Sequence, residues 1–181
     1  NLIKNVENLK LPKGRMELIK LKNNNYCCID YAHTPDALAA ALDALRAETS
    51  GNLFVVFGCG GDRDKGKRAQ MGQVAAEKAD HVIVTDDNPR TEDPALIRDE
   101  IRTGCPDSVA VWPRDNAIRQ AITQMSAHDS LLIAGKGHEK KQIFRNKIEL
   151  FDDKKVVHDY LKNDEYVTNI LVNINFFNFL F

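Results

Sequence analysis

The 181-residue sequence has almost no net charge, since 25 Lys and Arg offset 26 Asp and Glu for a formal charge of −1. No basic stretch dominates, which argues against nucleic acid or an anionic membrane as the main partner. The one strongly apolar stretch, residues 166–181, is too short and too rich in asparagine for a membrane-spanning helix. Because exposed apolar segments promote aggregation, we expect this stretch either to pack on the domain or to be foreign to the fold.

Cysteine is scarce as well, and no pair has the CxxC spacing of a zinc site. Cys27 and Cys28 are adjacent and would point to opposite faces of a strand, so with Cys59 and Cys105 they do not suggest a disulfide framework. Reduced thiols predict a cytoplasmic protein. The chain starts at Asn1 without the apolar core of a signal peptide, and we expect it to be a piece of a longer protein.

Short β-branched runs alternate with amphipathic helical stretches along most of the chain, whose length suits one domain. We expect helices at residues 35–48, 67–78, 94–102, 115–127 and 153–162, strands at 16–20, 26–30, 53–57, 81–85, 108–112 and 130–134, and a hairpin at 142–145 and 148–151. This alternation predicts an α/β fold: a Rossmann-like, doubly wound, mostly parallel sheet with helices on both faces and an antiparallel edge hairpin.

Four loops with dense polar content follow predicted strands, at residues 30–35, 58–67, 86–93 and 135–139. Ligands of such sheets bind beyond the carboxyl ends of the strands. The four loops should therefore meet at one edge of the sheet and form a site.

The first loop places Asp30 at a strand end and His33 in the following turn. These side chains could hydrogen-bond a ribose or a phosphate. Alternatively, Asp30 and Thr34 could merely cap the turn and the next helix.

The second loop is rich in glycine, and residues 61–68 nearly match the Walker A pattern GxxxxGK[ST]. The match fails at Arg68, which stands where a hydroxyl would coordinate magnesium. The loop also carries far more charge than a phosphate-wrapping loop. We therefore reject it as the ATP γ-phosphate site, and a structural turn with solvated charges remains the alternative.

The third loop offers a carboxylate at Asp87, an amide at Asn88 and a guanidinium at Arg90, with Pro89 stiffening the backbone. This set suits a zwitterionic amino acid, because a guanidinium binds a carboxylate and a carboxylate binds an ammonium group. A surface ion pair in a turn would be the simpler interpretation.

The fourth loop contains Gly135 and the pair His138-Glu139. The pair resembles the start of a zincin motif, but position 142 is Gln rather than the second histidine, so we predict no metal site. A backbone acceptor near Gly135 and the carboxylate of Glu139 fit amine recognition better.

Together and in this order, the strings DYAHTPDAL, FGCGGDRDKGKR, TDDNPRTEDP and AGKGHE resemble the C-terminal domain of the Mur ligases, most closely the diaminopimelate-adding type. The resemblance covers residues 14–162. It implies that residues 1–13 end a linker from a central domain, whereas residues 163–181 match no part of the family.

The resemblance implies that residues 87–90 form the recognition motif for meso-diaminopimelate, which Arg63, Gly135 and Glu139 would complete. Arg90 would carry the selectivity, because lysine lacks the far carboxylate and would leave the guanidinium poorly paired. Asp30 and His33 are implied ATP contacts.

The implied reaction is ATP-dependent formation of an amide bond between diaminopimelate and UDP-N-acetylmuramoyl-L-alanyl-D-glutamate in peptidoglycan synthesis. ATP and Mg²⁺ would bind mainly to the central domain, against which this domain packs, so we expect no catalytic residue here and no turnover by the chain alone. Two alternatives remain: another ligase of the superfamily, such as a folylpolyglutamate synthase, or a non-catalytic module that binds an amino acid.

Overall fold

The computed structural model describes residues 14–163, and the expectations for residues 1–13 and for the apolar tail lie outside the described residues, apart from Asn163. The main sheet has six strands in the order β1-β2-β6-β3-β4-β5. These are β1 (Glu17–Lys20), β2 (Tyr26–Asp30), β3 (Leu53–Phe57), β4 (His81–Val84), β5 (Val109–Ala110) and β6 (Ser130–Ala134). Only β1 pairs antiparallel within this sheet, and the other neighbours are parallel, as expected of a mostly parallel sheet.

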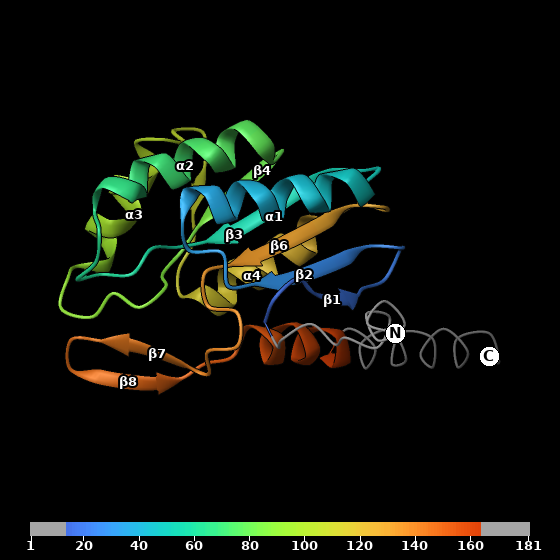
Figure 1. Cartoon of the computed structure of the whole chain (residues 1–181). Coiled ribbons are helices and arrows are strands. Elements are labelled where there is room, and N and C mark those ends of the chain that lie inside the picture. The colour runs from blue at the N-terminus through green and yellow to red at the C-terminus, as the bar shows by residue number, and fades with distance from the viewer. Residues whose placement is uncertain (1–13, 164–181) are drawn as a thin grey trace, which may run out of the picture.

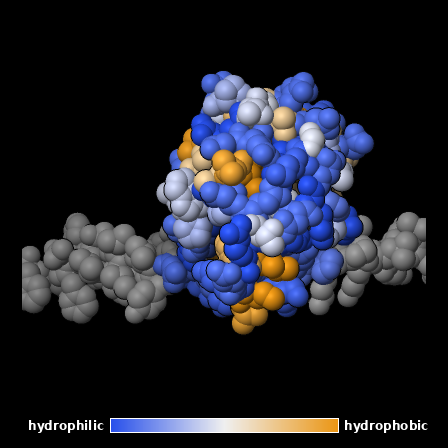
Figure 2. Space-filling model, turned by 90° about the vertical axis from the view of Figure 1, so that its left-hand side faces the viewer, coloured by the Kyte–Doolittle hydropathy of each residue, from blue (hydrophilic) through white to orange (hydrophobic). Residues whose placement is uncertain are grey.

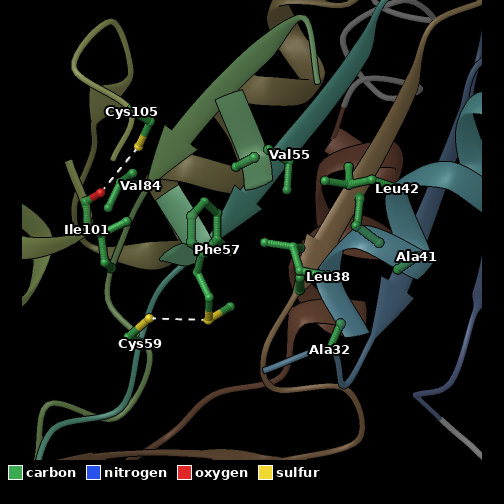
Figure 3. Close-up of a cluster of buried hydrophobic side chains, with 14 of the residues drawn as sticks. Ala32, Leu38, Ala41, Leu42, Val55, Phe57, Cys59, Val84, Ile101 and Cys105 are labelled. Carbon is green, nitrogen blue, oxygen red and sulfur yellow. Dashed lines mark hydrogen bonds between the residues drawn. The ribbon is translucent and has the colours of Figure 1, made fainter. Parts of the chain in front are cut away.

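Helices cover both faces of the sheet, as predicted (Figure 1). The labelled helices are α1 (Pro35–Glu48), α2 (Gly66–Lys78), α3 (Pro94–Arg102) and α4 (Arg114–Gln124), and residues 153–163 are also helical. On one face, buried side chains of α1, α2 and α3 pack against β3; Figure 3 shows Leu38 and Leu42 of α1 lying beside Val55 and Phe57. On the other face, α4 and the helix at residues 153–163 cover the sheet.

The adjacent cysteines of β2 illustrate the two faces. Cys28 belongs to the apolar cluster under α1, whereas Cys27 belongs to the cluster under α4. The opposite orientation predicted for this pair is therefore confirmed, and all four cysteines are free and buried.

Local signals explain why the helices begin where they do. The Thr34 hydroxyl accepts a hydrogen bond from the Ala37 amide at 3.3 Å, and Pro35 occupies the first turn of α1. Asp93 and Pro94 do the same for α3, where the carboxylate accepts from the Ala95 amide at 2.8 Å.

Three predicted elements differ from the structure by more than one residue at an end or in their pairing. The strand expected at residues 108–112 shortens to β5 (Val109–Ala110), and the helix expected to reach residue 127 ends at Gln124. The predicted hairpin forms, as β7 (Lys141–Phe144) and β8 (Lys147–Leu150), but as a separate two-stranded sheet; β1 is the antiparallel strand at the edge of the main sheet.

The side of the molecule shown in Figure 2 is mostly hydrophilic, with apolar patches near its middle and at its lower end. Ile148 and Leu150 of β8 are 65% and 94% exposed. Within residues 14–163, no helix combines the length and the apolar character needed to cross a bilayer.

Candidate functional site

The four polar loops meet at one edge of the sheet, as predicted. Asp30 at the end of β2 is in register with Ala134 at the end of β6, and Phe57 at the end of β3 is in register with Val84. Beyond these strand ends lies a cavity of about 410 Å³, which we call the edge cavity. Its lining comprises Tyr31, His33, Thr34, Gly58, Cys59, Gly60, Arg63, Asp64, Lys67, Asp87, Asn88, Arg90, Gly135 and Glu139.

The glycine-rich loop is packed directly against the loop that follows β4. The Gly61 amide donates to the Asn88 carbonyl at 2.9 Å, and a Cβ on Gly61 would lie only 1.9 Å from the Pro89 carbonyl oxygen. Glycine is therefore required for close backbone approach at this position.

Arg68, the residue that breaks the Walker A pattern, is fully buried. Its guanidinium pairs with Glu92 at 2.9 Å and with Glu100 at 2.6 Å, which ties α2 to α3 and to the loop before it. The residue therefore has a structural role, in agreement with the rejection of this loop as a γ-phosphate site. The hydrogen bonds from Arg68 also lower the pKa of Glu92 to about 2.

Arg90 lies at the cavity in an unusual backbone conformation, with φ of +52°. The hairpin holds this conformation: the Arg90 amide donates to the Ile143 carbonyl at 2.9 Å. The Arg90 side chain donates from Nη1 to the Gly61 carbonyl at 2.8 Å. The guanidinium is thus aimed by two neighbouring segments, and it presents its charge at the cavity wall.

A buried polar network links the third and fourth loops. Asn88 is 2% exposed, and its Nδ2 donates to Glu139 Oε2 at 2.9 Å. The Lys136 ammonium group donates to Asn88 Oδ1 at 3.1 Å and to Glu139 Oε2 at 3.2 Å. Burial opposes ionisation of Glu139, but the hydrogen bond from Asn88 and the charge of Lys136 outweigh it and lower the pKa of this carboxyl.

Asp87 supplies a second carboxylate to the cavity. Its Oδ1 accepts from the Asn88 amide at 2.7 Å, and its Oδ2 lies beside Gly135, where a Cβ would approach it to 2.9 Å. Gly135 has φ of +107°, a conformation that favours glycine. The lining therefore combines the carboxylates of Asp87 and Glu139 with cationic side chains, among them Arg90.

Of the remaining residues predicted for the site, two line the edge cavity and two do not. Arg63 and His33 line the edge cavity, and the His33 ring nitrogen Nδ1 lies 2.8 Å from the Tyr31 carbonyl oxygen. Pro89 is buried and lines a neighbouring cavity of about 460 Å³ instead. Asp30 does not line the edge cavity: its carboxylate accepts from the Met16 and Ala32 amides at 2.8 and 2.7 Å, as the capping interpretation expects.

Sequence reasoning missed two lysines and a glutamine at this site. Lys67 lines the cavity and donates to the His33 carbonyl at 2.7 Å. Gln142 and Lys136 are buried beneath the cavity, and the Gln142 amide donates to the Asp87 carbonyl at 2.7 Å. Lys67 and Lys136 both lie inside quoted motifs. Lysine and glutamine are usually exposed, so the burial of Lys136 and Gln142 had no signal in the sequence.

No group of three or more His, Cys, Asp or Glu residues within residues 14–163 could hold a metal ion. The cavity lining can form charge-assisted hydrogen bonds with a small molecule that carries both signs of charge.

Comparison with known proteins gives a consistent result. The family described as "Mur ligase, glutamate ligase domain" matches residues 14–137. The UDP-N-acetylmuramoyl-L-alanyl-D-glutamate--2,6-diaminopimelate ligase of Zymomonas mobilis is 55% identical over 136 residues, which are 75% of this chain and 28% of that protein. The ligase of the same name from Agrobacterium fabrum is 47% identical over 160 residues, covering 88% of this chain and 33% of that protein. The chain thus spans about a third of the length of these relatives.

Solved structures agree with these sequence matches. A diaminopimelate ligase structure of the same name superposes with a TM-score of 0.80 at 40% identity, covering 91% of this chain and 34% of that one. A folylpolyglutamate synthase/dihydrofolate synthase from Yersinia pestis superposes with a TM-score of 0.56 at 20% identity, over 70% of this chain and 28% of that one. This second likeness is one of fold alone.

Proposed function

The chain belongs to the Mur ligase family, as a C-terminal domain of the diaminopimelate-adding type, and from this premise we propose that the edge cavity binds meso-diaminopimelate. In the parent enzyme this amino acid would be joined to UDP-N-acetylmuramoyl-L-alanyl-D-glutamate during peptidoglycan synthesis. The domain would comprise residues 14–162 and act in the cytoplasm.

The observation that carries this proposal is the pairing of charges in the cavity lining. Diaminopimelate has a carboxylate and an ammonium group at each end, so its binding site needs donors and acceptors side by side. Arg90 and Asn88 can donate to a carboxylate, whereas Asp87 and Glu139 can accept from an ammonium group. L-lysine lacks the far carboxylate, and its binding would leave the Arg90 guanidinium poorly paired.

The other participants in the reaction are part of the same proposal. ATP would phosphorylate the D-glutamate carboxylate, and the amine of diaminopimelate would attack the acyl phosphate and release phosphate. His33, Arg63 and Lys67 give one part of the cavity a set of donors suited to phosphate oxygens. Mg²⁺ would be held mainly outside this domain and would neutralise charge on the transferring phosphoryl group. The role of this domain would be to hold and orient the amine.

Binding measurements on the unaltered chain and on Arg90→Gln test the proposal. Isothermal titration should show tighter binding of meso-diaminopimelate than of L-lysine. Removing one charge-assisted interaction costs about 1.5–3 kcal/mol, so Arg90→Gln should weaken diaminopimelate binding about ten- to hundredfold and change lysine binding little. Arg119→Gln on α4 is the matched control, since Arg119 does not line the cavity. Equal affinity for the two amino acids would contradict the proposal.

A second candidate is a module that binds diaminopimelate without any turnover. It is favoured by the buried, ion-paired Arg68, which stands where the near-Walker pattern would need a magnesium-binding hydroxyl. Incubation of the chain with ATP, Mg²⁺ and both other substrates tests whether the chain alone turns over. We expect no release of phosphate, and measurable release would reject the binding-only candidate for this chain.

A further inference from the structure

One buried lysine, Lys136, does not line the edge cavity but hydrogen-bonds to two residues that do. Lys136 is fully buried, directly after the Gly135 turn, and its Nζ lies 3.1 Å from Asn88 Oδ1 and 3.2 Å from Glu139 Oε2. A buried ammonium group is costly unless it is paired and hydrogen-bonded. Both partners of this one line the cavity, so the hydrogen bonds of Lys136 can act on a ligand through Asn88 and Glu139.

The first consequence concerns Asn88. Its Oδ1 accepts from Lys136 Nζ and, at 3.0 Å, from the Ile143 amide. A carbonyl oxygen has two lone pairs, so both are used. The amide orientation is thereby determined by the network, and Nδ2 is left to donate to Glu139 and to the cavity. Asn88 can then serve a ligand only as a donor, which suits a carboxylate and excludes an ammonium group.

The second consequence concerns Glu139. Its Oε2 accepts from both Asn88 and Lys136, and no hydrogen bond to Oε1 is found among residues 14–163. The hydrogen bond from Asn88 and the positive charges of Lys136 and Arg90 keep its pKa low despite its partial burial. Glu139 thus stays ionised and can accept from an ammonium group with its second oxygen.

We propose that Lys136 is a positioning residue for amino-acid recognition: together with the Ile143 amide it makes Asn88 a donor to the ligand carboxylate, and it keeps Glu139 an acceptor for the ligand ammonium group. The inference rests on the proposed function for the identity of the ligand.

Arg114 shows how a purely structural buried cation differs. It is also fully buried, but it bonds to the buried Asp153 and to backbone carbonyls, and neither it nor Asp153 lines the edge cavity. Lys136, in contrast, donates both of its side-chain hydrogen bonds to residues that line the edge cavity.

The test compares the unaltered chain with Lys136→Met, which keeps an unbranched side chain of similar length and removes the charge. Carbon-13 NMR of the glutamate carboxyl groups, with Glu139→Gln to assign the signal, reports the Glu139 pKa without any ligand. A nearby positive charge favours the ionised carboxylate, so the Glu139 pKa should rise in Lys136→Met. Diaminopimelate binding should weaken about tenfold or more. Lys140→Met, at an 80% exposed side chain, is the control and should change neither quantity.

An unchanged Glu139 pKa in folded Lys136→Met would overturn the inference. If that variant does not fold, the unaltered chain decides: Glu139 must titrate below its ordinary value of 4.5, and the Asn88 side-chain amide signals must move in the same titration. Titration of Glu139 at 4.5 or above would overturn the inference too. Failure of the unaltered chain to bind diaminopimelate, with this coupling intact, would instead refute the proposed function.

Discussion

Arg114 and Asp153 form an ion pair in which both side chains are fully buried. The contact is bidentate, with Nε to Oδ1 at 2.8 Å and Nη2 to Oδ2 at 2.9 Å. Arg114 also donates to the Ala134 carbonyl at 2.9 Å and to the Asp86 carbonyl at 3.4 Å. The pair therefore joins the start of the helix at residues 153–163 to the backbone from which two of the site loops depart.

We predict that Asp153→Asn is severely destabilising, because it leaves the Arg114 charge buried without a counter-ion. Removing one partner of a buried ion pair costs about 3–5 kcal/mol. A domain of this size has a total stability of about 5–15 kcal/mol, so the variant should lose a large share of it. The matched surface change is Asp43→Asn, whose carboxylate is 62% exposed and pairs with Lys78 at 2.7 Å. That change should cost about 0–1 kcal/mol.

Urea unfolding at pH 7, followed by circular dichroism, measures both free energies of unfolding. The double variant Arg114→Met/Asp153→Leu adds a second check, since replacing the whole pair with apolar residues should cost less than Asp153→Asn alone. An Asp153→Asn variant no less stable than Asp43→Asn would refute the reasoning. So would a double variant that is less stable than the single one.

Two further changes test the packing and the charge pairs around the site. Gly61→Ala would place a Cβ 1.9 Å from the Pro89 carbonyl oxygen. In the same urea assay it should lower the free energy of unfolding by at least about 1–3 kcal/mol, and it should weaken diaminopimelate binding. A Gly61→Ala variant with unchanged stability and binding would contradict the close packing. Hydrogen bonds from Arg68, the Asp62 backbone amide and Lys65 hold the pKa of Glu92 at about 2, below its ordinary 4.5. The stabilisation from the ionised carboxylate is therefore complete above pH 4.5 and is lost as the pH falls toward 2. Glu92→Gln should therefore lose less stability than the unaltered chain between pH 5 and 2, and identical pH profiles of the urea midpoint would rule this out.

Much of the fold was readable from the sequence because local signals and tertiary packing agree. The prediction matched the structure to the residue for helix Pro35–Glu48, which follows an N-cap and begins with proline. It also matched for the strands Leu53–Phe57 and Ser130–Ala134, which are apolar runs. The predicted ends of elements were less accurate where strand pairing or a following turn sets the end of the element. β5 has a neighbour on one side only, and just Val109–Ala110 are paired, whereas α4 ends before a turn in which the Ser126 amide donates to Asp129 at 2.7 Å.

The site was predictable as a set of loops but not as a network. Parallel strands end at one edge, so the polar loops were expected to meet, and they do. Which side chains would face the cavity and which would support it depends on burial. The pattern alone could not show that Asp30 caps its own turn, that Pro89 faces a neighbouring cavity, or that Lys136 lies beneath Asn88.

The claim that the edge cavity is a diaminopimelate site is best tested by amide NMR of the unaltered chain, titrated with meso-diaminopimelate and separately with L-lysine. We expect the largest chemical-shift changes at Asp87, Arg90, Gly135 and Glu139, with weaker changes for L-lysine. NMR detects even millimolar binding, so low affinity would not hide the effect. Changes of equal size for the two amino acids, or changes confined to residues remote from the cavity such as those of α4, would contradict the account.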